Sequence, residues 1–566
     1  MSAFTPFVTR DSRIADISTS VPARVEKGAA DANWQQIAAN NVSTSTVSWS
    51  VQTPSEHTII DRHIKMGADI TLKLTIPGHA ADTVPGIVYG GEGGGCFQAF
   101  PLNQLMQTCT LTVNQCSSSV QTQDIIGPLL RMSDDEVYAG YDCPSMVDKL
   151  YKHLSDLQTA TSNPAATLSK ANGTRVIPRG AHPLRSFIIE RYNAAGALQA
   201  TATEQSDSTA LDLAVNSTGV TDTWVAYLTI SVVEPILFAS PLIAGDKVEN
   251  QAGLVGVQSL QLVCNLDGSA KRAYCNSTNV NIGVSLYAIE NARLHVQYLS
   301  SQPSDLISAR SVVPFTQYDR YLTSHTGTVA SLATTQMISQ SLQLPQIPSR
   351  IVVVGRKRLT DCTAQDSMSF LPMSNVSVNF NNRSGLLSGA APHQLFEVSK
   401  RNGSHLEYRE FQGWANSGGM GSLATTGSVL VLNPSLDFGL AESLASGSVG
   451  TFNFQIQCSI QNTYGAEITP ELLVICEYAG VMVTEAGQTQ KQTGILSRDV
   501  VVQTSQDQFG ESLSYIRQAG AGNLMNGPIT GSKNTPMINM AKGMSGGARS
   551  GGASSGGGRG LARCAY

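Results

Sequence analysis

Residues 451–460 read T-F-N-F-Q-I-Q-C-S-I, and every second side chain in this stretch is apolar. Successive side chains of an extended chain point to opposite faces, so the alternation predicts a β-strand with one buried face and one outer face. The outer face carries hydroxyls and amides without charge. Such a face suggests contact with other protein, because charged groups are costly to desolvate in repeated contacts. The predicted buried side chains are Phe452, Phe454, Ile456, Cys458 and Ile460, and the predicted outer ones are Thr451, Asn453, Gln455, Gln457 and Ser459.

The composition of the whole chain agrees with an all-β protein. Of its 566 residues, 41% are apolar and 14% are charged, against roughly 25% charged in an average soluble domain. Ser, Thr, Asn, Gln and Gly replace the missing charge, and these residues are common in turns and on polar sheet faces. The net charge of -5 gives no reason to expect the body of the protein to bind nucleic acid. No stretch reaches the ~18 consecutive apolar residues of a membrane span, so we expect no transmembrane segment.

Strand patterns fall into two consecutive blocks of similar length, which divide near residues 240–250. Short strands separated by turns in each block favour β-sandwiches or jelly rolls over a parallel α/β sheet. Residues 1–44 are polar and irregular for most of their length, and we expect them to form an extended N-terminal arm. The one predicted helical region lies within residues 125–160, in particular at 125–132 and 146–157.

Two histidines and an aspartate form the pattern H-x3-D-x-H and would share one face of a strand. These residues, His57, Asp61 and His63, are a weak candidate metal site, because imidazoles and carboxylates are suitable ligands for zinc. The alternative is an exposed or subunit-facing strand that binds no metal. No pair of carboxylates and no Cys–His pair has a spacing typical of catalysis. We therefore expect no enzyme activity and no cofactor.

A second pattern joins an apolar strand to a basic cluster. Residues 350–358 read R-I-V-V-V-G-R-K-R, and Pro348 precedes them. One interpretation is a buried strand that leaves the core and enters solvent. The other is a basic rim at a subunit contact or facing a nucleic-acid interior. The rim would consist of Arg356, Lys357 and Arg358.

The C-terminal tail, residues 501–566, differs in kind from the rest of the chain. From Arg517 onward it contains no Asp or Glu, and residues 546–560 are almost entirely Gly, Ser, Ala and Arg. A segment of this composition cannot bury enough apolar surface to offset its ordering entropy. We therefore expect the tail to be partly disordered or removed by processing.

The tail also contains a short pattern that a protease could recognise, namely a large apolar residue, any residue, two glycines and then a cut. Extended segments with small side chains are what a protease cleft accepts. Chance repetition in a glycine-rich segment is the alternative explanation. The residues concerned are Met544, Gly546, Gly547 and Ala548.

Several segments occur in an order and at a spacing that resemble one known family. They are V-V-E-P-I-L-F-A-S-P-L at 232–242, V-P-F-T-Q-Y at 313–318, I-P-S-R-I-V-V at 347–353, N-F-N-N-R-S-G-L-L-S at 379–388, G-S-V-L-V-L-N-P at 427–434 and the strand at 451–460. Together they resemble the double jelly-roll major capsid proteins of polinton-like viruses, virophages and adintoviruses. The resemblance is close over roughly residues 230–500. Over residues 45–230 it is general, and it includes A-F-P-L-N at 99–103.

The resemblance implies two jelly rolls, over residues 45–243 and 244–500, and three chains in each pseudo-hexameric capsomer. Capsomers would tile the icosahedral shell of a double-stranded DNA virus, with penton and minor capsid proteins as neighbours and the DNA contacted at most indirectly. Members of these families are commonly processed by a virus-encoded, adenovirus-like cysteine protease, which implies cleavage after Gly547.

We therefore predict an all-β double jelly roll that acts as a major capsid protein in the virion and assembles inside the host cell. The alternatives are a minor capsid protein and a secreted β-sandwich adhesin. An adhesin predicts a signal sequence, whereas residues 1–26 carry scattered charges and no apolar core.

Overall fold

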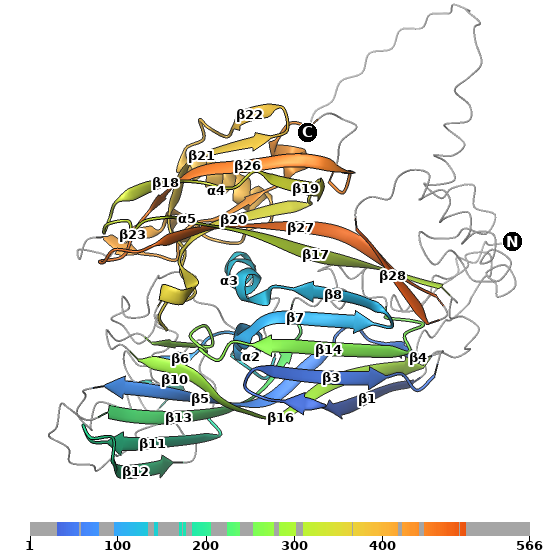
Figure 1. Ribbon diagram of the computed structural model, residues 1–566, viewed down its shortest axis with the longest axis vertical. Helices are drawn as coiled ribbons and strands as arrows, with labels where there is room; N and C mark the ends of the chain where they lie inside the picture. The colour runs from blue at the N-terminus through green and yellow to red at the C-terminus, as the bar shows by residue number, and fades with distance from the viewer. Residues whose placement is uncertain are drawn as a thin grey trace, which may run out of the picture. The chain divides into compact units, whose positions relative to one another are not determined.

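We describe the protein from a computed structural model (Figure 1). The predicted helix at 146–157 and most of the predicted N-terminal arm lie outside the described residues, as does the whole C-terminal tail. The described residues are 31–55, 58–77, 95–133, 141–144, 169–171, 174–176, 184–204, 223–237, 253–276, 282–300, 310–364, 366–416, 422–440, 446–485 and 487–493.

The first roll has the strand order of a jelly roll. If its principal strands are numbered one to eight along the chain, one sheet holds strands one, eight, three and six, and the other holds two, seven, four and five. The first sheet is β1 (Asp31–Ala38), β16 (Gly283–Ser300), β5 (Lys65–Pro77) and β13 (Thr223–Pro235), extended by β11 (Ser186–Tyr192) and β12 (Leu198–Glu204), with β4 (Thr58–Ile60) beside β16. The second is β3 (Thr46–Gln52), β14 (Ser259–Leu266), β7 (Met106–Val113) and β8 (Cys116–Val120), with β2 (Asn41–Val42) beside β3.

The second roll repeats this order. Its first sheet is β17 (Arg310–Ser324), β27 (Pro470–Glu485), β20 (Arg350–Lys357) and β25 (Val429–Leu432), with β28 (Gln488–Thr493) beside β27. Its second is β18 (Thr334–Ile338), β26 (Val449–Gln461), β21 (Met373–Phe380) and β22 (Arg383–Leu386), with β19 (Leu342–Gln346) beside β26. The chain is therefore an all-β protein with two consecutive jelly rolls.

Short elements connect the principal strands. None of the helices that the structure describes is long and apolar enough to cross a membrane. The helices are α2 (Pro101–Leu105), α3 (Thr122–Met132), α4 (Pro392–Arg401), α5 (Tyr408–Gln412), α6 (Pro434–Asp437) and the 3-10 turn η5 (Leu359–Asp361). The remaining strands pair in hairpins, β6 (Gly95–Phe97) with β15 (Tyr274–Asn276), β9 (Ser169–Ala171) with β10 (Thr174–Val176), and β23 (Trp414–Asn416) with β24 (Ser422–Ala424).

Strand pairing divides the chain later than the sequence predicted. Strand β14 pairs with β3 and β7, and β16 pairs with β1 and β5, so both belong to the first roll. The predicted division between residues 243 and 244 is therefore too early, and we place it between Ser300 and Arg310. The reason is topological, because the last two strands of a jelly roll return to pair with its earliest strands.

The predicted N-terminal arm is also partly strand. Strand β1 pairs with β16 without a break, from Asp31 opposite Ser300 to Ala38 opposite Arg293. Its side chains are mostly exposed, and Trp34 is 53% exposed. An edge strand held by backbone hydrogen bonds and little burial gives no alternating pattern, which is why the sequence did not reveal it.

The alternation at 451–460 is confirmed in β26. Phe452, Phe454, Ile456, Cys458 and Ile460 are all buried, and the residues between them are exposed or half-buried. The buried set packs in the core of the second roll.

The sheet that contains β20 is buried on both faces. Ile351 and Val353 belong to the core of the second roll, whereas Val352 and Val354 belong to the cluster that fills the first roll. A strand covered on both sides reads as a continuous apolar run, as residues 351–354 do. The outer face of this sheet therefore packs against the first roll.

Candidate functional site

Helix α3 joins the two rolls. It follows β8, packs against β7 and contacts β17 and β25 of the second roll (Figure 1). Every residue from Thr122 to Met132 is buried except Gln123, which is half-buried. A helix of mostly apolar residues is suited to such a buried position. The rolls thus meet through a shared core.

The first turn of α3 carries a buried carboxylate that pairs with two arginines of the second roll. Asp124 Oδ1 lies 2.6 Å from Arg356 Nη2 on β20, and its Oδ2 lies 3.0 Å from Arg320 Nε on β17. Arg356 Nε also lies 3.3 Å from Glu471 Oε2 on β27. The side chains of Asp124, Arg356 and Glu471 are 8%, 9% and 7% exposed. Buried charges of this kind are tolerated only when paired.

Two more arginines hold the ends of α3 in place. Arg131 Nε donates to Met368 O of the second roll at 3.1 Å. Arg272 donates to Met106 O at 3.0 Å and to Gln123 O at 3.2 Å. Burial lowers the pKa of Arg272 to about 10, so this guanidinium remains protonated at neutral pH.

The predicted basic rim is divided between the interior and the surface. Arg356 is buried, and the rim interpretation is wrong for it, because α3 covers β20 at this point. Lys357 Nζ lies 2.9 Å from Asp366 Oδ2, and the lysine side chain is 16% exposed. Arg358 is 44% exposed and its Nε lies 3.4 Å from Asp361 Oδ2. A contact with a neighbouring subunit stays a prediction for Lys357 and Arg358.

The candidate metal residues are only partly described. His57 lies outside the described residues. Asp61 Oδ1 lies 2.8 Å from His63 Nδ1 and accepts a hydrogen bond from the His63 backbone N–H at 3.0 Å. The hydrogen bond with Asp61 raises the pKa of His63 above its usual value. In the part of the chain that the structure describes, no group of three or more His, Cys, Asp or Glu residues is arranged to hold a metal. Metal binding at this strand stays a prediction.

The predicted protease segment, Met544, Gly546, Gly547 and Ala548, lies outside the described residues. Its processing therefore also stays a prediction.

Two sequence segments that carried the family resemblance meet inside the first roll. Glu234 is fully buried and accepts hydrogen bonds from the backbone N–H groups of Leu102 at 2.8 Å and Asn103 at 2.9 Å. The Asn103 side-chain amide donates to Glu234 at 2.8 Å and to Pro235 O at 2.9 Å. Burial raises the pKa of Glu234 to about 7. This carboxyl group ties the start of α2 to the end of β13.

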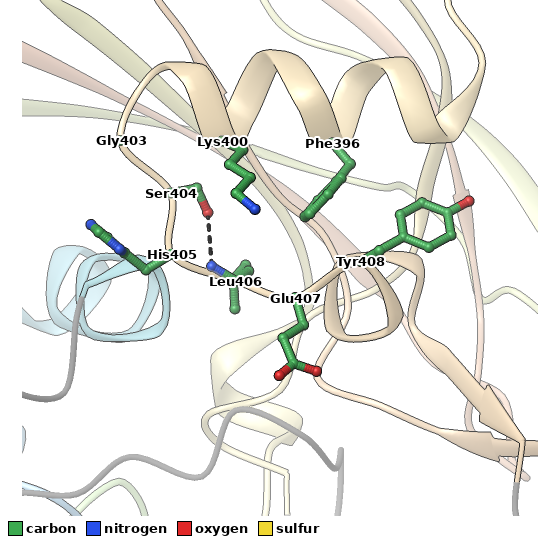
Figure 2. Close-up of a pocket in the computed structure, with 8 residues that line it drawn as sticks. All are labelled: Phe396, Lys400, Gly403, Ser404, His405, Leu406, Glu407 and Tyr408. Atoms are coloured by element: carbon green, nitrogen blue, oxygen red, sulfur yellow. Dashed lines mark hydrogen bonds between the residues drawn. The ribbon is translucent and has the colours of Figure 1, made fainter.

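A pocket of about 520 Å³ lies between α4 and the start of α5 (Figure 2). The rings of Phe396 and Tyr408 meet edge to face with centroids 5.4 Å apart, and Lys400 Nζ lies 6.0 Å from the centre of the Phe396 ring. Nearby, the His405 backbone N–H donates to Met132 O at the end of α3 at 2.9 Å. The loop between α4 and α5 is therefore also tied to the first roll.

Comparison with known proteins shows the family to which this chain belongs. A family model described as the Sputnik virophage major capsid protein first domain matches residues 2–307, which is more than half of the chain. The chain belongs to the Sputnik virophage major capsid protein family. A second model, the major capsid protein V20 C-terminal domain, matches residues 318–480. The protein is thus a capsid protein of the virion shell, and its family is a structural one.

Individual relatives agree with this assignment. The putative capsid protein V20 of Sputnik virophage is 24% identical over 505 residues, which cover 84% of this capsid protein and 78% of V20. A chain of the Sputnik virophage cryo-EM structure has a TM-score of 0.67 at 22% identity, covering 85% of this chain and 91% of that one. The mavirus major capsid protein has a TM-score of 0.63 at 13% identity, covering 83% and 92%. The two solved structures share the fold of this chain.

Proposed function

We propose that this capsid protein forms trimers, that the six rolls of a trimer make one pseudo-hexameric capsomer, and that capsomers tile an icosahedral shell around double-stranded DNA. The observation that carries the proposal is the sheet of β17, β27, β20 and β25, which is buried on both faces by its own roll and by α3 of the other. Each chain thereby supplies two rolls in a fixed relation. Three chains supply six, and head-to-tail contacts related by a rotation can close into a ring.

We further propose that the protein acts by assembly, without enzyme activity. Membership of a structural capsid family supports this role. The ion pairs of Asp124 with Arg356 and Arg320 support it too, since both link α3 of the first roll to a strand of the second. A minor capsid protein is the alternative role, and the copy number of the chain in purified particles distinguishes the two.

The same role suggests further partners. We propose penton and minor capsid proteins as neighbours in the shell, and only indirect contact with the DNA. The net charge of -5 supports the last point, because strong DNA binding requires an excess of basic side chains.

We also propose that a virus-encoded cysteine protease cuts after Gly547. The intact mass of the chain extracted from mature particles tests this. A chain that ends at Gly547 is expected, and a chain that ends at Tyr566 would contradict the cleavage.

Native mass spectrometry of the purified protein tests the proposed assembly. We expect a complex of three chains, each of 59.9 kDa before any processing, and hexagonal outlines by negative-stain electron microscopy. A protein that stays monomeric at micromolar concentration by both methods would overturn the proposal.

A further inference from the structure

Within one chain, helix α3 of the first roll packs on a sheet of the second roll. The equivalent contact, between helix α4 of the second roll and a sheet of a first roll, is not made within the described part of the chain. The outer sheet face of the second roll is covered by α3 of the first roll, whereas the matching sheet face of the first roll carries half-buried side chains and the exposed Tyr287. We propose that α4 of a second copy of this protein docks on that exposed face. This inference rests on the proposed trimer and adds to it which surfaces meet.

The helix side of the contact follows from strand order. Helix α3 comes directly after β8, the fifth principal strand of the first roll, and packs on β7, the fourth. Helix α4 follows β22, the fifth principal strand of the second roll, and contacts β21, the fourth, and more extensively β25, the sixth. The two helices therefore occupy equivalent places in the strand order of their rolls.

The outward faces of these helices can be matched residue by residue. In α3, Asp124 and Arg131 bind the second roll, and Gly127 lies between them, with the space for a Cβ only 3.5 Å from Phe370. These positions are the third, sixth and tenth of the helix. In α4 the same positions are exposed, with side chains 67% exposed at the sixth and 57% at the tenth. They are held by Gln394, Glu397 and Arg401.

The inward face of α4 is already used. Leu395 and Ser399 are buried, and Ser399 Oγ donates to Leu395 O and accepts from the Val431 backbone N–H. The helix is thus anchored to its own roll by one face. The opposite face of α4 corresponds to the one that α3 turns toward the second roll.

The receiving surface is the outer face of the β16–β5–β13–β11 sheet. Strand register places Ile188, Tyr227, Lys73 and Ser285 in one row across the four strands, all half-buried. Tyr287 lies beside this row, is 57% exposed and has its ring centroid 4.9 Å from that of Tyr227. Aromatic side chains with few charges are typical of protein contact surfaces.

The contact within one chain is more apolar than the proposed contact between chains, and this difference has a physical reason. The contact inside one chain forms as the chain folds and can be apolar, as the Val352, Val354 and Ile475 side chains are. A contact between chains must stay soluble until assembly, since large exposed apolar patches cause aggregation. Tyrosine and hydroxyl groups on the sheet, and charged groups on α4, meet that requirement.

The variant Tyr287→Arg tests the sheet side of the proposed contact, and the dissociation constant of its trimer is the quantity measured. We expect the dissociation constant to rise about tenfold or more, as for loss of a central interface aromatic. Tyr287 is more than half exposed, so the melting temperature of the dissociated chain should not change. Ile338→Arg is the matched control, because Ile338 is 49% exposed on β18 in the other sheet of the second roll and should leave trimers intact.

Photo-crosslinking locates the partner surface. We would place p-benzoylphenylalanine at position 287 and irradiate trimers assembled from isotope-labelled and unlabelled copies. Crosslinks between copies to residues 390–412 are expected. Trimers that form normally but crosslink elsewhere, or a Tyr287→Arg trimer of unchanged stability, would overturn this inference alone. A wild-type protein that forms no trimer would overturn the proposed function and this inference with it.

Discussion

At the scale of single residues, the pair formed by Arg356 and Asp124 places opposite charges at the centre of the junction between the rolls. Both side chains are less than 10% exposed, and their closest nitrogen and oxygen atoms are 2.6 Å apart. Arg320 and Glu471 complete a network in which every charge has a partner. Such a network favours this orientation of the rolls, because buried charges that lose their partners are costly.

Arg356→Met should therefore destabilise the protein strongly. The change leaves Asp124 with one arginine instead of two and removes Arg356 from Glu471, and breaking a buried pair costs about 3–5 kcal/mol of unfolding free energy. Urea denaturation followed by fluorescence measures this. Arg358→Met is the matched control, and its effect should be below about 1 kcal/mol because its ion pair is largely exposed. Equal effects of the two changes would contradict the assigned network.

Glu234 predicts a pH dependence of stability. Its pKa is raised from 4.5 to about 7 in the folded protein, mainly by burial. The folded state therefore holds this proton more tightly than the unfolded state. The resulting stabilisation is fully present below pH 4.5 and is lost as the pH rises through 7.

The variant Glu234→Gln isolates this contribution. It should be less stable at acidic pH, because its amide N–H₂ faces N–H donors, but its unfolding free energy should fall less between pH 5 and pH 8 than that of the wild type. Denaturation curves across that range measure the difference. The same pH slope in both proteins would contradict the raised pKa.

The sequence revealed the basic residues of the junction but not their partners. Asp124 and Glu471 lie 232 and 115 residues from Arg356. A local pattern contains no information about such distant pairs, so the basic cluster was open to the rim interpretation. The buried Arg356 could be recognised only once β20 was placed beneath α3.

At the scale of elements, the two equivalent helices show what local sequence can predict. The helix predicted at 125–132 is confirmed within α3, whose apolar residues form a clear cluster. Helix α4 was not predicted, because its sequence P-H-Q-L-F-E-V-S-K-R is short and mostly polar. Its stability comes from packing one narrow face against β25, which is a tertiary effect.

Two glycines at the junction should respond oppositely to alanine. A Cβ at Gly127 in α3 would meet Phe370 at 3.5 Å, an ordinary contact, so Gly127→Ala should stabilise the protein by about 0.5–1 kcal/mol through helix propensity. A Cβ at Gly355 in β20 would lie 2.6 Å from Ile460 Cδ1, so Gly355→Ala should destabilise it by about 1–3 kcal/mol. Thermal denaturation compares them, and a stabilising Gly355→Ala would refute the packing described for β20.

Strands were predictable where one face is buried. Strand β26 alternates as its sequence indicated, since its inner residues fill a core and its outer residues do not. Strand β1 has the same role in the first roll that β17 has in the second, yet its exposed side chains gave no pattern. A strand sequence therefore alternates only where one face of the strand is buried.

At the scale of the whole molecule, the double jelly roll was predictable by resemblance but the boundary between the rolls was not. The predicted division fell near the middle of the chain, before β14 and β16, whose partners lie earlier in the sequence. Because pairing in a jelly roll is non-local, two blocks of strands of similar length do not mark two domains. The junction at α3 joins the two rolls through a shared core.

We propose that this protein builds a viral shell from trimers with two rolls per chain. Electron cryomicroscopy of purified particles tests this assembly. We expect hexagonal capsomers that each contain three copies of this chain, with its two rolls at alternating corners. Capsomers built from another number of chains, or a shell in which this chain occupies only a few minor positions, would contradict it.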